Sequence, residues 1–304
     1  MSTMKLGFIG ASGLMGHGMA KNLLAKGAAL GHTLAIAGHR RRERVADLLD
    51  GGAQELADAA ALGAACDVVF LCVTGSPQVE EVVAGAQGLL QTPRPGLVIV
   101  DCSTSEPDSS ARLREQCAAR GVAFVDAPLT RGPAEAEAGR LNVMVGADAE
   151  VFARVQPLIA LFAENIFHVG PPGAGHVVKL MNNFVSQAVC TAAAEAFAVG
   201  RLAGVDPKQF IAVASVGAVN SGLLQTMAKT LDGTLDGMKF ELDNARKDLR
   251  YYTHLAERVG APALLGEAVH QSLTLASALG HGSKYVPSLV EAQEQITGAK
   301  LVPR

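Results

Sequence analysis

The pattern of apolar residues changes near position 170, and this change most constrains the fold. Before it, short apolar runs alternate with segments of helical spacing, whereas after it every segment reads as helix. Alternation of this kind is typical of βαβ units in a mostly parallel sheet with helices on both faces. The expected strands are residues 5–10, 33–37, 67–73, 97–101, 122–126, 141–145 and 166–169.

Gly170-Pro171-Pro172-Gly173 ends the last expected strand, because two successive prolines cannot donate to a sheet ladder. The sequence then predicts one long helix from residue 175 to about 204. We therefore expect an α/β domain over residues 1–170 and an all-α domain over residues 171–300, joined by a long interdomain helix. Shorter helices are expected at 208–216, 223–231, 240–259 and 263–279, and residues 301–304 (Leu-Val-Pro-Arg) match the remnant of a thrombin-cleavable tag, outside the fold.

Composition excludes several classes of protein. The 304 residues carry a net charge of −3 with no long run of one sign, which argues against a nucleic-acid partner. The five cysteines form no C-x-x-C pair and have no histidine at metal-ligand spacing, which favours free thiols in a reducing compartment and no metal site. With no signal-peptide layout and no apolar run of about 18 residues, we expect a cytoplasmic protein without a membrane partner.

A glycine-rich turn, Gly10-Ala11-Ser12-Gly13-Leu14-Met15-Gly16, follows the first expected strand and opens the first helix. Glycines allow a tight turn and let backbone amides approach a pyrophosphate, which the helix N-terminus also favours. The spacing is one residue longer in its first step than the usual dinucleotide fingerprint. We predict a Rossmann-type dinucleotide-binding domain, with contacts from Gly10, Ser12, Gly13, Leu14 and Met15.

The residues after the second expected strand bear on the choice of cofactor. An acidic side chain there binds the ribose 2′-hydroxyl of NAD, whereas arginine accommodates the 2′-phosphate of NADP. This chain has Gly38-His39-Arg40-Arg41-Arg42 and no acid. NADP(H) is therefore preferred and NAD(H) possible, with His39, Arg40 and Arg41 as contacts; a solvated basic helix start is the alternative explanation.

Two further motifs lie in the first half of the chain, and others follow up to residue 249. The first two are Gly13-Leu14-Met15-Gly16 with Met19-Ala20-Lys21-Asn22-Leu23, and Asp101-Cys102-Ser103-Thr104-Ser105-Glu106-Pro107. They resemble motifs of the β-hydroxyacid dehydrogenase family, which includes 3-hydroxyisobutyrate dehydrogenase, tartronate semialdehyde reductase and sulfolactaldehyde reductase. The resemblance assigns Ser103 to substrate and Thr104 to cofactor, although a helix cap before Pro107 explains the same residues. It also places Val73, Thr74 and Gln78 beside the cofactor.

Asp126-Ala127-Pro128-Leu129-Thr130-Arg131-Gly132 resembles the family's D-A-P-V-S-G-G segment, but an arginine stands in the middle, as in the sulfolactaldehyde reductase pattern. The planar guanidinium suits carboxylate, sulfonate or phosphate. We infer that Arg131 holds the anionic tail of a small substrate, with a surface arginine as the alternative explanation, and the resemblance adds Thr130 and Gly132 to the substrate site. It also argues against simple 3-hydroxyisobutyrate as that substrate.

Gly173-Ala174-Gly175-His176-Val177-Val178-Lys179-Leu180-Met181-Asn182-Asn183 resembles the family's G-x-G-x-x-x-K-x-x-N-N motif, which implies that Lys179 is the general acid/base and that Asn182 and Asn183 bind substrate. Lys179 and Asn183 are four residues apart and so share one helix face. Burying such groups in an apolar helix is costly unless they are used. Partial desolvation lowers the pKa of a lysine, which suits proton transfer near neutral pH.

Phe240-Glu241-Leu242-Asp243-Asn244-Ala245-Arg246-Lys247-Asp248-Leu249 resembles the family's F-x-x-x-L-x-x-K-D-L helix. The resemblance implies that Lys247 reaches the cofactor and that Asp248 makes a structural ion pair. The family's later aspartate near the C-terminus is missing, and Tyr285 or a neighbour occupies its place.

The motifs together predict an NAD(P)-dependent oxidoreductase that interconverts a small β-hydroxy acid and its semialdehyde or keto form in a cleft between the domains. Apolar residues recur along the long helix at Val185, Val189 and Val199, which favours a homodimer or homotetramer. An imine reductase is the alternative enzyme, although such relatives usually replace the lysine. A non-catalytic NADP(H) sensor is the alternative outside the enzymes. Neither the substrate nor the direction of reaction follows from the sequence.

Overall fold

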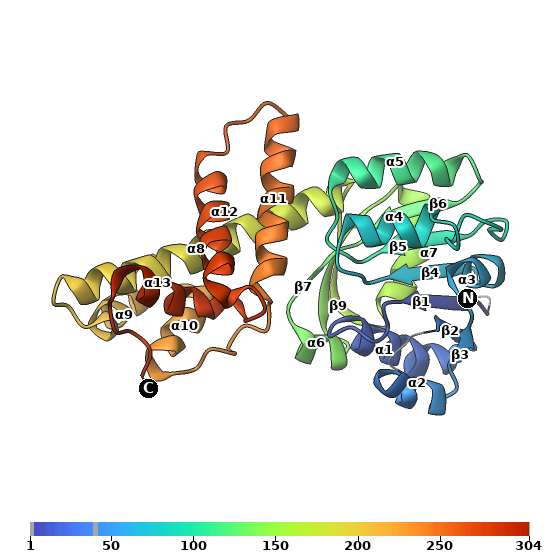
Figure 1. Ribbon diagram of the computed structural model, residues 1–304. Coiled ribbons are helices and arrows are strands. Elements are labelled where there is room, and N and C mark those ends of the chain that lie inside the picture. Colours follow the sequence, from blue (N-terminus) through green and yellow to red (C-terminus); the bar gives the residue numbers. More distant parts are fainter. Residues whose placement is uncertain (1–2, 39–41, 304) are drawn as a thin grey trace. The chain divides into compact units, whose positions relative to one another are not determined.

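A computed structural model describes residues 3–38 and 42–303 of the chain (Figure 1). The chain forms two compact units, Met1–Lys179 and Leu180–Arg304. The sequence places the domain boundary near residue 170, where strand β9 (Ala163–Gly170) ends; the division between the units falls inside the next helix, α8 (Ala174–Leu202).

The first unit is built on one sheet, which has nine strands within the described residues. Its order is β3-β2-β1-β4-β5-β6-β8-β7, with β9 paired to β8. The strands are parallel except where β8 meets β6 and β7. The predicted Rossmann-type fold is confirmed, and the β1–β4 neighbours form the switch point at which such sheets bind ligands. The other bounds are β1 Lys5–Ile9, β2 Thr33–Ala37, β3 Gln54–Leu56, β4 Val68–Leu71, β5 Val98–Asp101, β6 Ala123–Asp126, β7 Leu129–Thr130 and β8 Leu141–Gly146.

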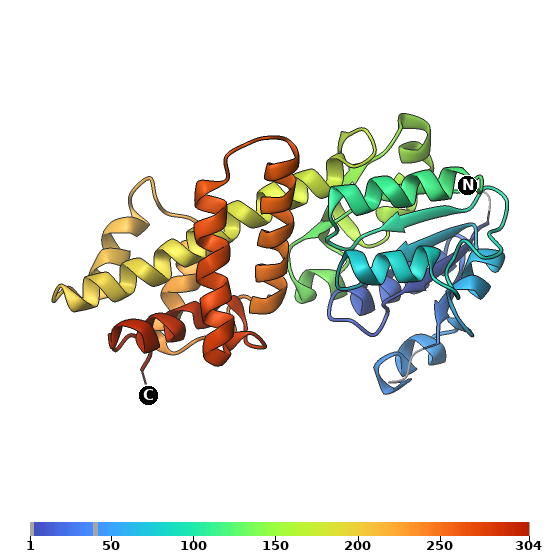
Figure 2. The same cartoon turned by 45° about the horizontal axis from the view of Figure 1, so that its top comes forward.

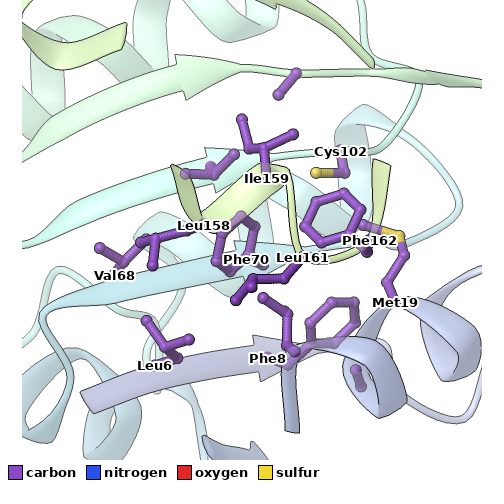
Figure 3. Close-up of a cluster of buried hydrophobic side chains, with 14 of the residues drawn as sticks. Leu6, Phe8, Met19, Val68, Phe70, Cys102, Leu158, Ile159, Leu161 and Phe162 are labelled. Carbon is purple, nitrogen blue, oxygen red and sulfur yellow. The ribbon is translucent and has the colours of Figure 1, made fainter. Parts of the chain in front are cut away.

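Helices cover both faces of this sheet, which explains why its central strands are almost continuously apolar. In β4, Val68 and Phe70 belong to one buried cluster, and Val69 and Leu71 belong to the other. Figure 3 shows Phe70 in the first cluster, where its ring meets that of Phe162 edge to face with 5.6 Å between centroids. The first cluster includes side chains of α1 (Gly16–Ala28), α2 (Ala46–Asp50), α6 (Pro133–Glu137) and α7 (Ala149–Ile159), and the second those of α3 (Ala59–Ala65), α4 (Ser76–Ala84) and α5 (Pro107–Ala118).

Regular structure in the second unit is helical over residues 180–303, as the sequence predicts. Helices α11 and α12 pack side by side, which Figures 1 and 2 both show. Phe197, Met227, Leu249 and Leu273 lie in the buried core of the unit. The helices that follow α8 are α9 Pro207–Ser215, α10 Gly222–Ala228, α11 Leu242–Arg258, α12 Leu264–Ala276 and α13 Leu289–Thr297.

The C-terminal segment corrects one expectation. Leu301 is buried in the core of the second unit, and its backbone N–H and that of Val302 donate to the Glu294 carboxylate at 2.5 and 3.0 Å. The structure thus places these two residues inside the fold, because an apolar side chain at position 301 meets an apolar core. The origin of residues 301–304 in a tag stays a prediction. No helix in residues 3–38 and 42–303 is long and apolar enough to cross a bilayer.

Candidate active site

The turn after β1 is shaped by two glycines that no other residue could replace. Gly10 has φ +95°, and a Cβ there would lie 2.0 Å from the carbonyl oxygen of Cys72. A Cβ at Gly16 would lie 2.1 Å from the oxygen of Gly10. The turn therefore packs backbone against backbone at the start of α1. This cradle fits the pyrophosphate of a dinucleotide.

The described cofactor candidates of the first unit lie in the segments that follow β1, β4 and β5. Leu14 is 63% exposed although it is apolar, as suits a residue that covers a ligand. Of the other described residues, Thr74 and Gln78 are exposed, whereas Ser12, Gly13, Met15, Val73 and Thr104 are half-buried.

The predicted 2′-phosphate contacts His39, Arg40 and Arg41 lie outside the described residues. Arg42, the next residue in the sequence, pairs through its guanidinium with the Glu55 carboxylate of β3 at 2.5 Å. This arginine is thus already engaged by an acid.

Ser103 joins the segments that follow β4 and β5. It is 3% exposed, and its hydroxyl oxygen accepts a hydrogen bond from the Val73 N–H at 3.0 Å. The Ser103 N–H in turn donates to Asp101 at 2.9 Å. Because a hydroxyl also has a proton to donate, this structural contact is compatible with a second, ligand-binding one.

The cysteines near this edge of the sheet are unreactive. Burial and the Asp101 carboxylate raise the pKa of the Cys72 thiol to about 12, against the opposing effect of the Lys179 ammonium. Burial also raises the pKa of Cys102 well above its ordinary value. Both thiols are therefore protonated at neutral pH and unsuited to nucleophilic catalysis. The effect of Lys179 on Cys72 shows that its ammonium group lies close enough to the end of β4 to act on that thiol.

Lys179 lies in the second turn of α8 and is half-buried. Its Nζ donates a hydrogen bond of 2.6 Å to the carbonyl oxygen of Leu129 in β7. One turn earlier on the helix, His176 is fully buried, and its Nδ1 lies 2.8 Å from the Ser110 hydroxyl. The sequence leaves open whether His176 lines the site or faces solvent; the structure buries it against α5.

The predicted substrate segment 130–132 has an unusual backbone. Among the residues that the structure describes, Arg131 is the one non-glycine residue with positive φ, at +75°. Its guanidinium pairs with the Glu164 carboxylate and donates to the Arg140 carbonyl. The Thr130 hydroxyl accepts from Asn142 at 3.1 Å, and the Gly132 N–H donates to Glu135 at 3.0 Å. These contacts are internal to the unit.

In the second unit, a buried carboxylate orients the predicted amide. Asn183 is 5% exposed, and its Nδ2 donates to Asp248 at 2.6 Å. The ion pair expected of Asp248 is made with Lys247, whose Nζ lies 3.0 Å from the other carboxylate oxygen. Asn182 is exposed and donates to the Asn183 side-chain oxygen at 3.2 Å.

Two family models match the chain over most of its length. Residues 5–170 match the NAD-binding domain of 6-phosphogluconate dehydrogenase, and residues 173–292 match the NAD-binding domain of NADP-dependent 3-hydroxyisobutyrate dehydrogenase. The chain belongs to the β-hydroxyacid dehydrogenase family. It is an NAD(P)-dependent oxidoreductase with a nicotinamide dinucleotide cofactor, which confirms the class of enzyme predicted from the motifs.

Individual relatives agree with this membership. The chain is 31% identical to 2-(hydroxymethyl)glutarate dehydrogenase of Eubacterium barkeri, with 98% of each protein covered. It is 34% identical to 2-hydroxy-3-oxopropionate reductase of Escherichia coli, with 98% of this chain and 100% of the relative covered. The solved 3-hydroxyisobutyrate dehydrogenase of Mycobacterium tuberculosis, with L-serine, has the same fold: TM-score 0.83, 23% identity, and 95% and 99% of the two chains covered.

Sequence reasoning did not assign the structural roles of Gly18, Asp101 and Asp126. A Cβ at Gly18 would lie 2.4 Å from the carbonyl carbon of Ala136. Asp101 and Asp126 are fully buried carboxylates, paired in register at the ends of β5 and β6. An aspartate that directly follows three apolar strand residues is a signal for such a role, since an unsatisfied buried carboxylate is costly.

Proposed function

We propose that this protein is an NADP(H)-preferring dehydrogenase or reductase of a small β-hydroxy acid or related anionic hydroxy compound, with Lys179 as its general acid/base. The observation that carries the proposal is the hydrogen bond from Lys179 Nζ to the Leu129 carbonyl. It holds a half-buried ammonium group in one place, at the end of the sheet where Rossmann-type folds bind their cofactor.

The proposed reaction combines a hydride transfer with a proton transfer by the Lys179 ammonium group. A bound nicotinamide supplies or accepts the hydride at the substrate carbon. In reduction, the Lys179 ammonium donates a proton to the carbonyl oxygen as the alcohol forms, and in oxidation the neutral amine takes that proton back. An ammonium has three N–H donors, and the Leu129 carbonyl accepts one of them. In the proposed reaction, the ammonium donates a proton to the substrate oxygen.

The substrate is proposed to be held by Ser103, Thr130, Gly132, Asn182 and Asn183. Asp248 supports this role of Asn183, because a carboxylate at 2.6 Å keeps the amide in one orientation with its oxygen as acceptor. An anionic substrate is further supported by the names of the relatives, which denote hydroxy or oxo carboxylic acids.

Arg131 is proposed to bind the anionic group of the substrate. In the structure its guanidinium already pairs with Glu164, whose side chain is 49% exposed. An exposed pair of this kind is worth little, about 1 kcal/mol or less. A substrate carboxylate or sulfonate can therefore take the place of Glu164 at small cost.

The preference for NADP(H) rests on His39, Arg40 and Arg41 and on the lack of an acid directly after β2. NAD(H) remains a possible second cofactor, and Lys247 is proposed to contact the cofactor from α11. A cytoplasmic location is proposed because the five cysteines, all within the described residues, are free.

A homodimer or homotetramer is proposed to form through the second unit. Along α8, Val185 and Val199 are 58% and 60% exposed, and on α9 and just after it Val213 and Val216 are 72% and 90% exposed. Exposed apolar side chains in this number mark an interface. Sedimentation of the purified protein tests this, and a monomer at micromolar concentration would contradict it.

Absorbance of the reduced nicotinamide, with a panel of hydroxy acids and semialdehydes that carry carboxylate, sulfonate or phosphate tails, tests the activity. Lys179→Met should lower kcat by at least about 1000-fold while cofactor affinity stays within about two-fold. Lys208→Met, at an exposed lysine paired with Asp232, is the matched control and should keep full activity.

Each alternative predicts a different result. A cofactor sensor binds NADP(H) with no turnover of any compound in the panel, and an imine reductase turns over cyclic imines in preference to semialdehydes. Full activity of Lys179→Met would overturn the proposed mechanism.

A further inference from the structure

The start of α8 is capped by a carboxylate from a different element. Asp126, at the end of β6, is 1% exposed. One of its oxygens accepts from the Gly173 N–H at 2.6 Å and the other from the His176 N–H at 3.0 Å. The first N–H groups of a helix have no partner within the helix, and negative charge is favoured at that end. The Asp126 carboxylate therefore fixes the position of the first turn of α8.

The surrounding backbone lies close to this carboxylate on two sides. A Cβ at Gly146 would lie 2.6 Å from the Asp126 Oδ2, and a Cβ at Gly175 would lie 2.7 Å from the same atom. The end of β8 and the start of α8 thus close around the side chain from two sides. Because both neighbours are backbone, neither can shift without moving a strand or a helix.

The same segment also holds the functional end of the Lys179 side chain. Leu129, whose carbonyl accepts from Lys179 Nζ, lies three residues after Asp126. Between them, Pro128 has a fixed φ, and its carbonyl accepts from the Met144 N–H at 3.0 Å. Segment 126–129 is therefore bonded to α8 at two points: at the helix start through a carboxylate, and at the lysine through a carbonyl.

We propose that Asp126 is a positioning residue for Lys179, acting through the first turn of α8. The carboxylate fixes where the helix begins, and the helix delivers the ammonium to the Leu129 carbonyl. The inference rests on the proposed role of Lys179 in proton transfer. A displacement of about 1 Å of a group that transfers a proton costs about 100-fold in rate. Loss of the Asp126 cap should therefore lower kcat.

Loss of the Asp126 carboxylate does not release the helix altogether. The His176 ring stays bonded to the Ser110 hydroxyl of α5 at 2.8 Å. The helix start is thus expected to loosen while the fold persists. This separates a positioning effect, which lowers kcat, from general unfolding, which lowers the amount of active protein.

The test compares Asp126→Asn and Asp126→Ala with the wild type. Asparagine keeps one acceptor but turns an N–H₂ toward a backbone N–H, and alanine keeps none. We expect kcat to fall about 10- to 100-fold for asparagine and further for alanine, with KM changed less than kcat. The affinity for NADP(H), followed by cofactor fluorescence, should stay within about two-fold. The limb of the kcat–pH profile that reports Lys179 should also move, which a purely structural role would not produce.

Asp58→Ala is the matched control, because Asp58 also caps a helix of the first unit, accepting from Ala61 N at 2.8 Å at the start of α3. It should destabilise the protein by about 1 kcal/mol without changing kcat per folded molecule. Wild-type kcat and pH profile in Asp126→Asn, beside an inactive Lys179→Met, would overturn this inference alone. An active Lys179→Met would overturn the proposed function and this inference with it.

Discussion

Two segments at the same edge of the sheet work by opposite means. The turn over residues 10–16 presents backbone, and its decisive positions are glycines because any Cβ there would meet a carbonyl at about 2 Å. The segment over residues 126–132 presents side chains and single carbonyls, and its most unusual position is an arginine in a left-handed conformation. Under the proposed function, the backbone of the first segment holds a cofactor common to many enzymes, whereas the side chains of the second distinguish a particular substrate.

The largest expected effect is at the glycine turn. Gly10→Ala adds a Cβ 2.0 Å from the Cys72 oxygen at φ +95°, whereas Gly52→Ala adds one in open space at φ +99°. The second change should cost about 1 kcal/mol, from the backbone conformation alone. The first should cost more than about 4 kcal/mol and abolish cofactor binding, because a packed backbone has to move. Urea denaturation and cofactor fluorescence measure both; equal losses in the two variants would refute the close packing.

A smaller effect is expected in the side-chain segment. Arg131→Gly removes the cost of a left-handed conformation in a non-glycine residue, which is about 1 kcal/mol. It also makes the unfolded chain more flexible, which lowers the free energy of unfolding. The free energy of unfolding should therefore change by less than about 1 kcal/mol, while KM for an anionic substrate rises about 10- to 100-fold. Arg131→Asn is the control, since asparagine tolerates this conformation and also lacks the charge. An unchanged KM in both variants would remove Arg131 from the substrate site.

The smallest effect concerns the histidine that directly follows the glycine turn. His17, in the first turn of α1, contacts Glu137 of α6 at 2.6 Å and Asp47 of α2 at 3.1 Å. Burial lowers the pKa of His17, but the hydrogen bonds to both carboxylates outweigh it and leave that pKa raised. The contact should thus stabilise the protein fully below the unfolded-state pKa of His17, about 6.5, and lose its effect as the pH rises through the folded-state pKa.

The Asp47 and Glu137 carboxylates set the lowest pH at which the contacts of His17 stabilise the protein. Burial raises the pKa of Asp47 and of Glu137, but bonds to His17 leave both lowered, so their contribution is lost as the pH falls through their folded-state values. We expect wild type and His17→Gln to differ in stability more at pH 5.5 than at pH 8.5, by less than about 1 kcal/mol. Thermal denaturation at the two pH values measures this, and a constant difference would contradict it.

Much of the fold could be predicted from the sequence because local pattern decides it. Continuous apolar runs identify the buried strands, and the double proline at 171–172 coincides with the end of β9. The two-residue strand β7 and its antiparallel pairing with β8 have no such signal, since two residues show no periodicity. The same holds for β3, which is half-buried at the end of the sheet order.

Site residues could be predicted in kind but not in their contacts. Glycine spacing and the position of Lys179 follow from motif and helix period. The pairing of Arg131 with Glu164, or of Asn183 with Asp248, depends on side chains 33 and 65 residues apart, which no local pattern reports. The capping role of Asp126 escaped for the same reason: its partners lie 47 and 50 residues further along the chain.

The closure of Gly146 and Gly175 around the Asp126 carboxylate has a consequence for how this chain can vary. A longer acid at position 126 has no space, and a shorter residue leaves a hole beside Gly146 and Gly175. Backbone atoms keep both positions glycine in any case, because a Cβ at Gly175 would lie 2.6 Å from the Met144 oxygen and one at Gly146 would lie 2.8 Å from the Gly175 nitrogen. A designer who wishes to move the start of α8 would therefore have to rebuild the backbone there as well as the side chain at position 126.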